Sequence, residues 1–271
     1  MCAQGENPTP YPLVTIRDTQ VRSLRSQIVE GMEYHIYVAL PEGYQTSLES
    51  YPALYLLDAW HAFGTFVGAY SLHFGWGLVP KLVLFGISHP GTSVQDHLFS
   101  RSRDFIPTKL SIAQVLARHG PVFASITPIS GGAPNFLRFL RQELFPFTER
   151  EYRLVPSDRG LFGYSYGGLF ALYALFTAPE LFSAILSAVR QAGGMTTRSF
   201  AMKPRMRRTT PRCPPGSTPR WEAQRVICRF RRGSDCEILY SAGAIVACTC
   251  RRSCFLARTI SRAMHWPTCM P

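Results

Sequence analysis

Hydrophobic and polar positions follow two different periods along the first 189 residues of the chain. Short apolar or β-branched runs, as expected for strands, lie at 13–17, 33–40, 53–57, 82–87, 159–163 and 182–187. Apolar residues three or four positions apart, as expected for helices, lie at 63–77, 133–147 and 169–176. Strands that alternate with helices predict an α/β fold, with a mostly parallel central sheet flanked by helices.

The pattern changes near residue 190. Beyond it no period lasts, apart from a short apolar run at 242–247. Residues 1–189 hold 13 basic and 14 acidic residues (net −1), whereas residues 190–271 hold 16 and 3 (net +13). Seven of the eight cysteines also lie between Cys213 and Cys269. We therefore predict an incomplete α/β core at 1–189 and an Arg-, Cys- and Pro-rich tail at 190–271 that lacks a stable fold.

No targeting or membrane segment is visible in the sequence. Residues 1–20 contain no basic stretch followed by an apolar run, so no signal peptide is predicted. No apolar run approaches the roughly 18 residues that would span a bilayer. With a single cysteine in its first 189 residues, the chain is expected to be a soluble protein of the reducing cytoplasm that does not bind membranes.

The clearest chemical motif lies at residues 163–167, which read Gly-Tyr-Ser-Tyr-Gly. A serine in G-x-S-x-G, between a strand and a helix, stands on a tight turn that exposes its hydroxyl for nucleophilic attack. A strand is predicted before this motif and a helix after it, so we interpret Ser165 as a catalytic nucleophile rather than as part of an ordinary glycine-rich turn. The backbone N–H of Tyr166 would be one oxyanion-hole donor, and Ala59 or Trp60, after the strand at 53–57, would supply the second.

Four segments together resemble the putative-esterase family of α/β-hydrolases, which includes esterase D-like and enterochelin esterase-like proteins. They lie at 51–58, 103–108, 131–137 and 163–173, and the resemblance covers about residues 10–189. It implies an α/β-hydrolase fold and the hydrolysis of carboxylic esters by a serine, an acid and a histidine, in that order along the chain. Of these three residues, only the serine maps onto this sequence, as Ser165.

The family resemblance stops where the composition changes. In the family, the strand after the nucleophile helix leads into a segment of the type Ser-Pro-Ser-x-Trp-Trp, which is missing here. The codons of residues 193–196, read one nucleotide earlier, permit Trp-Trp-Asp-Asp, and those of Met202 and Lys203 then force a glutamate. We hypothesise that residues from about 188 onward are a frameshift product. The alternatives are a divergent natural tail and a retained intron.

The missing base and acid have few replacements in the sequence. His265 is the only histidine after Ser165, and it is a candidate base by position alone. The acids after Ser165 are Glu180, Glu222, Asp235 and Glu237, and none has a supporting context. A serine hydrolase without its base retains only the catalysis of its oxyanion hole and binding site, so losses of roughly 10⁴-fold are expected.

Several other polar and aromatic residues could belong to a site. His61 and His89 follow strands and could line the pocket, although a structural role is the commoner one. Arg101, Arg103 and Asp104 could bind a charged substrate, but we favour charge-assisted bonds that hold a loop together. We expect Trp60 and Trp76 in the core or the pocket wall. The C-x-C-x₃-C spacing of Cys248, Cys250 and Cys254 lacks the paired C-x₂-C of zinc sites, so no metal and no cofactor is predicted.

The sequence thus predicts a serine carboxylic-ester hydrolase whose substrate is a small-molecule ester, either a small acyl ester or a siderophore-like ester. The missing acid and histidine predict that the chain is catalytically impaired. The alternative is a non-catalytic protein whose basic tail binds nucleic acid or other polyanions through charge alone. No nucleic-acid recognition module is visible, so no specific nucleic-acid partner is expected.

Overall fold

The computed structural model describes residues 15–91, 93–113, 116, 121 and 130–190, and the strands at 206–209, 224–229, 235–241 and 244–249. In the first part, the strands are β1 (Thr19–Arg25), β2 (Glu33–Ala39), β3 (Tyr51–Leu56), β4 (Val83–Ser88), β5 (Leu154–Tyr164) and β6 (Ala184–Arg190). The helices are α1 (Ala59–Gly75), α2 (Val94–Phe105), α4 (Ala133–Phe139), η2 (Leu140–Leu144), α5 (Phe145–Glu151), α6 (Tyr166–Thr177) and η3 (Pro179–Leu181). From β3 to β6, strands thus alternate with helical segments, as predicted.

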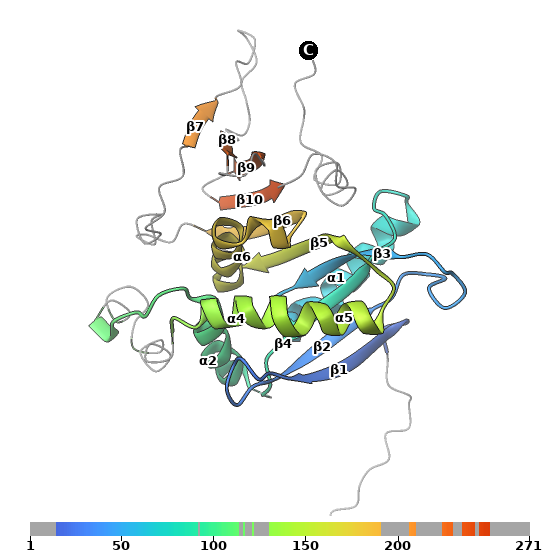
Figure 1. Ribbon diagram of the computed structural model, residues 1–271, viewed down its shortest axis with the longest axis horizontal. Coiled ribbons are helices and arrows are strands. Elements are labelled where there is room, and N and C mark those ends of the chain that lie inside the picture. Colours follow the sequence, from blue (N-terminus) through green and yellow to red (C-terminus); the bar gives the residue numbers. More distant parts are fainter. Residues whose placement is uncertain are drawn as a thin grey trace, which may run out of the picture.

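The first six strands form a twisted sheet in the order β1-β2-β4-β3-β5-β6 (Figure 1). β3 pairs in parallel with β4 and with β5, and β5 pairs in parallel with β6. β1 and β2 add an antiparallel edge, since β1 pairs with β2 and β2 with β4 in opposite directions. The predicted α/β fold with a parallel central sheet is therefore confirmed for this part of the chain.

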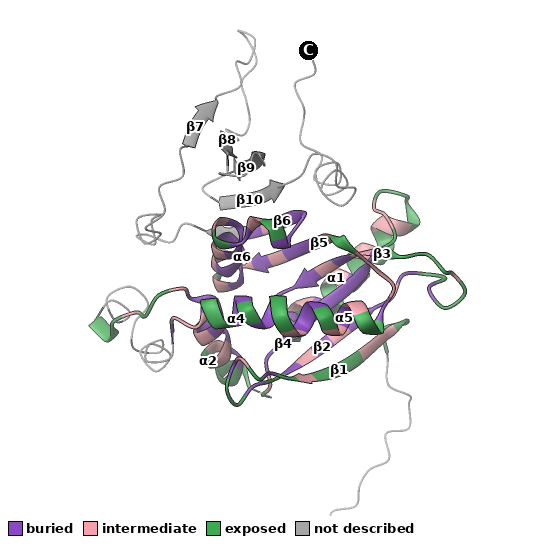
Figure 2. Ribbon diagram, in the orientation of Figure 1, coloured by how far each residue is buried: buried purple, intermediate pink, exposed green. Residues whose placement is uncertain are grey.

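Both faces of the central strands are buried, which explains their continuous apolar runs. One face packs on α1 through Phe63 and Val67, which contact Leu56 and Leu84. The opposite face packs on α2, α4, α5 and α6. Its buried strand residues include Tyr55 on β3 and Val83 and Phe85 on β4. Figure 2 shows the buried strands between helices whose outer faces are exposed. This layered packing holds fixed the carboxyl ends of β3 and β5, from which α1 and α6 begin.

The predicted helix at 133–147 is a longer unit with a change of pitch. α4, η2 and α5 follow one another without a break, and η2 is a π-helical turn. Glu143 lies in that turn and accepts hydrogen bonds from the Ser26 hydroxyl (2.7 Å) and from the Gln27 N–H (2.8 Å). The π-helical turn thus attaches this helix to the loop between β1 and β2.

The first strand differs from the prediction. β1 begins at Thr19, whereas the strand was predicted at 13–17; residues 15–17 are not in a strand, and 13–14 lie outside the described residues. Asp18 stands between the two positions with a φ of 57°, which turns the chain. β1 lies at the sheet edge with most of its residues exposed or only half-buried, so its sequence has no apolar alternation to mark it.

Beyond residue 190 the sheet continues with antiparallel strands. β7 (Met206–Thr209), β8 (Gln224–Arg229), β9 (Asp235–Ser241) and β10 (Ala244–Thr249) extend it in the order β6-β10-β9-β8-β7. β10 pairs antiparallel with β6, so the parallel part of the sheet ends there. The sequence suggested an apolar run but no strand pairing in this region. That the tail lacks a stable fold stays a prediction. In the described part of the chain, no helix has the length and apolar character needed to span a bilayer.

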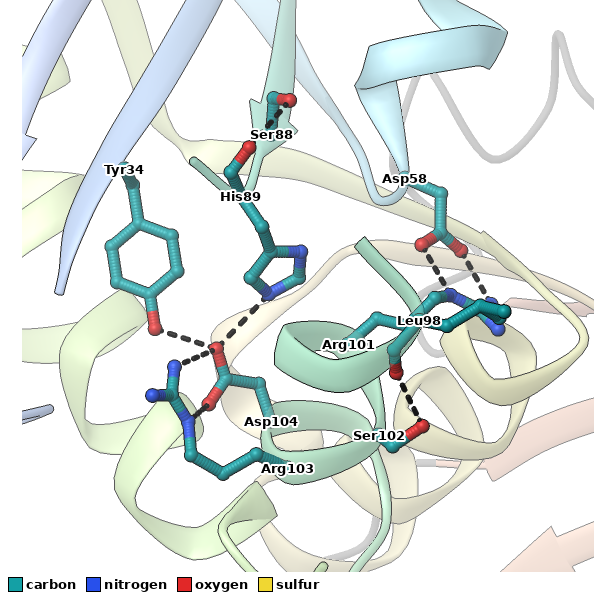
Figure 3. A network of polar contacts seen from close by, with 9 residues as sticks. All are labelled: Tyr34, Asp58, Ser88, His89, Leu98, Arg101, Ser102, Arg103 and Asp104. Carbon is teal, nitrogen blue, oxygen red and sulfur yellow. Dashed lines mark hydrogen bonds and ion pairs between the residues drawn. The ribbon is translucent and has the colours of Figure 1, made fainter. Parts of the chain in front are cut away.

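A buried polar network joins β2, β4 and α2 (Figure 3). Asp104, which is 1% exposed, accepts a hydrogen bond from the Tyr34 hydroxyl at 2.7 Å, and its Oδ2 lies 3.0 Å from His89 Nε2. Arg103 Nε donates to Asp104 Oδ1 at 2.7 Å. Burial alone would raise the pKa of Asp104, but the hydrogen bonds from His89 and Arg103 outweigh it and lower that pKa. Arg103 and Asp104 therefore have the structural role favoured from the sequence.

Replacing Asp104 tests the contribution of this network to stability. Asp104→Asn leaves buried donors poorly paired, so we expect the free energy of unfolding at pH 7 to fall by about 3 kcal/mol. Because the folded pKa lies below the value of about 3.9 for an unfolded aspartate, the carboxylate stabilises the fold above that pH, and this contribution is lost as the pH falls below it. Denaturant titrations between pH 7 and pH 3 measure both effects.

The exposed Glu42 provides the control for this comparison. Glu42→Gln is expected to change the free energy of unfolding by less than about 0.5 kcal/mol. Wild type should lose more stability than Asp104→Asn as the pH falls from 5 to 3. Equal losses of stability in wild type and in Asp104→Asn would mean that Asp104 does not stabilise the fold through its charge.

Candidate active site

Ser165 lies at the turn between β5 and α6. Its backbone has φ 53° and ψ −121°, and it is the residue immediately before the first residue of α6. A positive φ is strained for a residue with a Cβ and persists only when the surrounding structure enforces it. Ser165 is exposed, although the residues at the end of β5 and most of those in α6 are buried or half-buried. Ser165 thus has the backbone position of a nucleophile elbow and an accessible hydroxyl.

Two glycines make this turn sterically possible. A Cβ on Gly163 would overlap the carbonyl oxygen of Gly167 and lie 2.9 Å from the backbone nitrogen of Gly168. These neighbours are backbone atoms and cannot rotate away, so the turn closes only with glycine at this position. A Cβ on Gly167 would lie 3.0 Å from Asp58 Oδ2. The start of α6 is therefore packed directly against the loop that follows β3.

That loop places the start of α1 beside the start of α6. Asp58 precedes α1 with a left-handed backbone (φ 56°, ψ 39°), and Ala59 and Trp60 are the first two residues of the helix. The first N–H groups of a helix have no partner within it and carry partial positive charge. Tyr166 begins α6 in the same way. The three predicted oxyanion-hole residues thus lie at two adjoining helix starts, and their role as donors stays a prediction.

A buried ion pair fixes the position of Asp58 (Figure 3). Arg101, from α2, donates through Nε to Asp58 Oδ1 at 2.7 Å and through a second guanidinium nitrogen to Oδ2 at 2.8 Å. Asp58 is 4% exposed and Arg101 is 7% exposed. Sequence reasoning missed Asp58; its signal was an acidic residue directly after a buried apolar strand. Arg101 does hold a loop, as favoured from the sequence, but the loop is the one after β3.

Aromatic and imidazole rings surround the elbow. The guanidinium carbon of Arg101 lies 5.2 Å from the ring centre of Tyr166, and burial raises the pKa of that tyrosine, with Arg101 acting in the opposite direction. The indole of Trp60 stacks on His97 with ring centres 4.1 Å apart. The ring of His61, an exposed residue, meets Tyr164 edge-on at 5.6 Å. Burial lowers the pKa of His97 and so favours its neutral form.

Three other residues considered from the sequence are His89, Trp76 and Glu180. His89 is bound in the Asp104 network and has a structural contact there. Trp76 is 75% exposed at the end of α1, so its prediction as core or pocket wall was wrong. Glu180 is exposed and lies 3.9 Å from Arg141 in a surface ion pair.

The candidate base and the other acids are not brought to the elbow by any described contact. His265 and Glu222 lie outside the described residues, and Asp235 and Glu237 belong to β9. Cys248 is in β10, whereas Cys250 and Cys254 lie outside the described residues. Within the described part of the chain, no three His, Cys, Asp or Glu side chains gather into a group that could hold a metal ion.

Sequence comparison supports the family resemblance. Residues 104–229 match the family model described as "Putative esterase", so the match begins within α2, includes the elbow and extends past residue 189, where the resemblance was expected to end. The chain is 33% identical over 178 residues to the ferri-bacillibactin esterase BesA of Bacillus subtilis (strain 168). The aligned segment covers 64% of this chain and 58% of BesA.

Solved structures agree with this result. The chain resembles an IroE-like serine hydrolase from Shewanella oneidensis (TM-score 0.53, 31% identity, 67% of this chain and 54% of that chain). It also resembles the siderophore hydrolase EstB from Aspergillus nidulans (TM-score 0.52, 26% identity, 65% of this chain and 57% of that chain). The chain thus spans less than two thirds of the length of these relatives. The predicted resemblance to the putative-esterase family is therefore confirmed for this part of the chain, together with the α/β-hydrolase fold.

Proposed function

We propose that this chain is a serine carboxylic-ester hydrolase in which Ser165 is the nucleophile. The observation that carries the proposal is the geometry at Ser165: an exposed serine with a positive φ, between β5 and α6, at the contact of two helix starts. A serine held in this way presents its hydroxyl outward, and the first N–H groups of α6 and α1 would be the donors beside it. This combination serves acyl transfer and has no evident use in packing.

The proposed reaction follows from this arrangement. The Ser165 hydroxyl oxygen attacks the ester carbonyl carbon, and its proton passes to a base. The carbonyl oxygen becomes an oxyanion, which the N–H of Tyr166 and that of Ala59 or Trp60 stabilise. The C–O bond to the alcohol then breaks, the alcohol takes up the proton, and an acyl-serine remains. Water hydrolyses this ester and releases the carboxylic acid.

The proposed substrates are small-molecule esters, either simple acyl esters or siderophore-like esters. The relatives support the second group, because BesA is named a ferri-bacillibactin esterase and EstB a siderophore hydrolase. A site beside Ser165 would offer the exposed Trp60 and His61 to the substrate. No cofactor enters the proposed reaction, which needs only a base, an oxyanion hole and water.

Serine-dependent hydrolysis of p-nitrophenyl acetate tests the proposal. We expect slow turnover, roughly 10⁴-fold below that of a hydrolase with a complete triad, because the family's base and acid are not recognisable in the chain. Ser165→Ala should abolish the acetylation of residue 165 measured by mass spectrometry and lower the turnover to the residual rate of the binding site alone.

The matched control for this assay is Ser71→Ala, which changes an exposed serine of α1 and should leave turnover unaltered. Turnover in Ser165→Ala equal to that of wild type, with no acetylation of Ser165 in wild type, would contradict the proposal. If wild type shows neither turnover nor acetylation but binds DNA in a salt-sensitive way, the alternative function, a basic tail that binds polyanions, is supported instead.

We further propose that residues from about 188 onward are read out of frame, and that the residues in frame would supply the acid and the histidine. The change from net −1 to net +13 near residue 190 supports this proposal. Sequencing of the gene and its transcript across the codons of Phe182 to Met206 is expected to reveal one missing or extra nucleotide. If sequencing finds the reading frame unchanged, the frameshift proposal is contradicted. The chain would then be a divergent relative with only part of a triad.

A further inference from the structure

One face of α2 contacts the segment after β3, which contains Ala59 and Trp60, the two candidates for the second oxyanion donor. His97 and Arg101 are four residues apart on α2, so their side chains lie on the same face of the helix. His97 stacks on Trp60, and Arg101 binds Asp58 through two hydrogen bonds. Both α2 residues are buried. Residues 58 and 60 are therefore held by this face of α2.

Asp58 has an unusual role for an aspartate that precedes a helix. Such a residue commonly accepts a hydrogen bond from the first turn of its own helix with an extended backbone. Asp58 instead has a left-handed backbone and makes no side-chain cap bond to α1. Both carboxylate oxygens bind Arg101. The carboxylate thus fixes the start of α1 relative to α2 rather than closing the helix end.

The same guanidinium also reaches the nucleophile elbow. Its carbon lies 5.2 Å from the ring centre of Tyr166 and 6.0 Å from that of Tyr164, the two neighbours of Ser165. Oδ2 of Asp58, which Arg101 binds, lies 3.0 Å from the position of a Cβ on Gly167. Arg101 therefore contacts residues on both sides of Ser165 and the residue before Ala59. These two segments are the walls of the proposed oxyanion hole.

We propose that Arg101 is a positioning residue that couples the start of α1 to the nucleophile elbow and so sets the distance between the two oxyanion donors. The proposal rests on the proposed function of Ser165. Two strained residues, Ser165 and Asp58, lie on the two sides of this contact. Strained backbone needs surrounding contacts to hold it, and a planar guanidinium with two donors toward one carboxylate fixes direction as well as distance. A lysine would keep the charge but lose this directional pair.

The experiment compares wild type with Arg101→Met, Arg101→Lys and the control Arg103→Met. Arg103 lies on the same helix and also binds a buried carboxylate, that of Asp104, but not at the elbow. Hydrogen exchange measured by mass spectrometry follows peptides that cover 57–62 and 163–169, with 83–88 in β4 as the reference. In Arg101→Met we expect exchange at least about tenfold faster in both test peptides and unchanged in the reference. Arg103→Met weakens the Asp104 network but leaves the Asp58–Arg101 pair, so it should speed exchange in both test peptides far less than Arg101→Met does.

Kinetics of p-nitrophenyl acetate hydrolysis give the second readout. Arg101→Met is expected to lower kcat by about 10²-fold, as does the loss of one oxyanion donor, with KM within about twofold of wild type. Arg101→Lys should fall between wild type and Arg101→Met, and it replaces Arg101→Met if circular dichroism shows that the latter does not fold. A raised KM with unchanged kcat would mean that Arg101 binds substrate, and it would overturn the proposal.

The two readouts separate this proposal from the proposed function. If wild type shows no Ser165-dependent turnover, the function is contradicted, while the exchange data still decide whether Arg101 couples the two segments. Faster exchange in only one test peptide, or in neither, would overturn the coupling. Faster exchange in both, together with the fall in kcat, would support it.

Discussion

The contact between the backbone of Gly163 and that of Gly167 is the constraint on which the rest of the site depends. No Cβ fits there, because it would overlap the Gly167 carbonyl and approach the Gly168 nitrogen to 2.9 Å. This contact lets β5 pass into α6 without a loop, and it leaves Ser165 with a positive φ and an exposed side chain. The parallel pairing of β3 with β5 then brings the start of α1 alongside. Sheet order, glycines and helix starts thus form one arrangement.

The sequence predicted what depends on local pattern. The elbow follows from five consecutive residues between a strand and a helix, and the central strands from their apolar runs. The Asp58–Arg101 pair could not be predicted in the same way, because its partners are 43 residues apart and meet only when α2 packs near β3. β1 lies at an exposed edge and has no apolar alternation. Trp76 was wrongly placed inside because its residue type, not its position at the end of α1, guided the prediction.

The described part of the chain contains the proposed nucleophile, Ser165, with the contacts that support it. Arg101 joins the two helix starts, and the separate Asp104 network secures α2 to β2 and β4, so the helix that holds the site is itself anchored in the core. The reversal of strand direction at β6, where β10 pairs antiparallel, coincides with the change in composition near residue 190. The proposed frameshift accounts for the composition and for the missing acid and histidine together.

A crystal structure of the protein after reaction with an alkyl phosphonate would test the central claim, which is that Ser165 faces an oxyanion hole made by two helix starts. A phosphonate bound to the serine oxygen places one oxygen where the oxyanion of an ester would lie. Our account predicts that this oxygen lies about 2.7–3.1 Å from the N–H nitrogen of Tyr166 and from that of Ala59 or Trp60. A phosphonate oxygen that faces solvent, or attachment at a residue other than Ser165, would contradict the account.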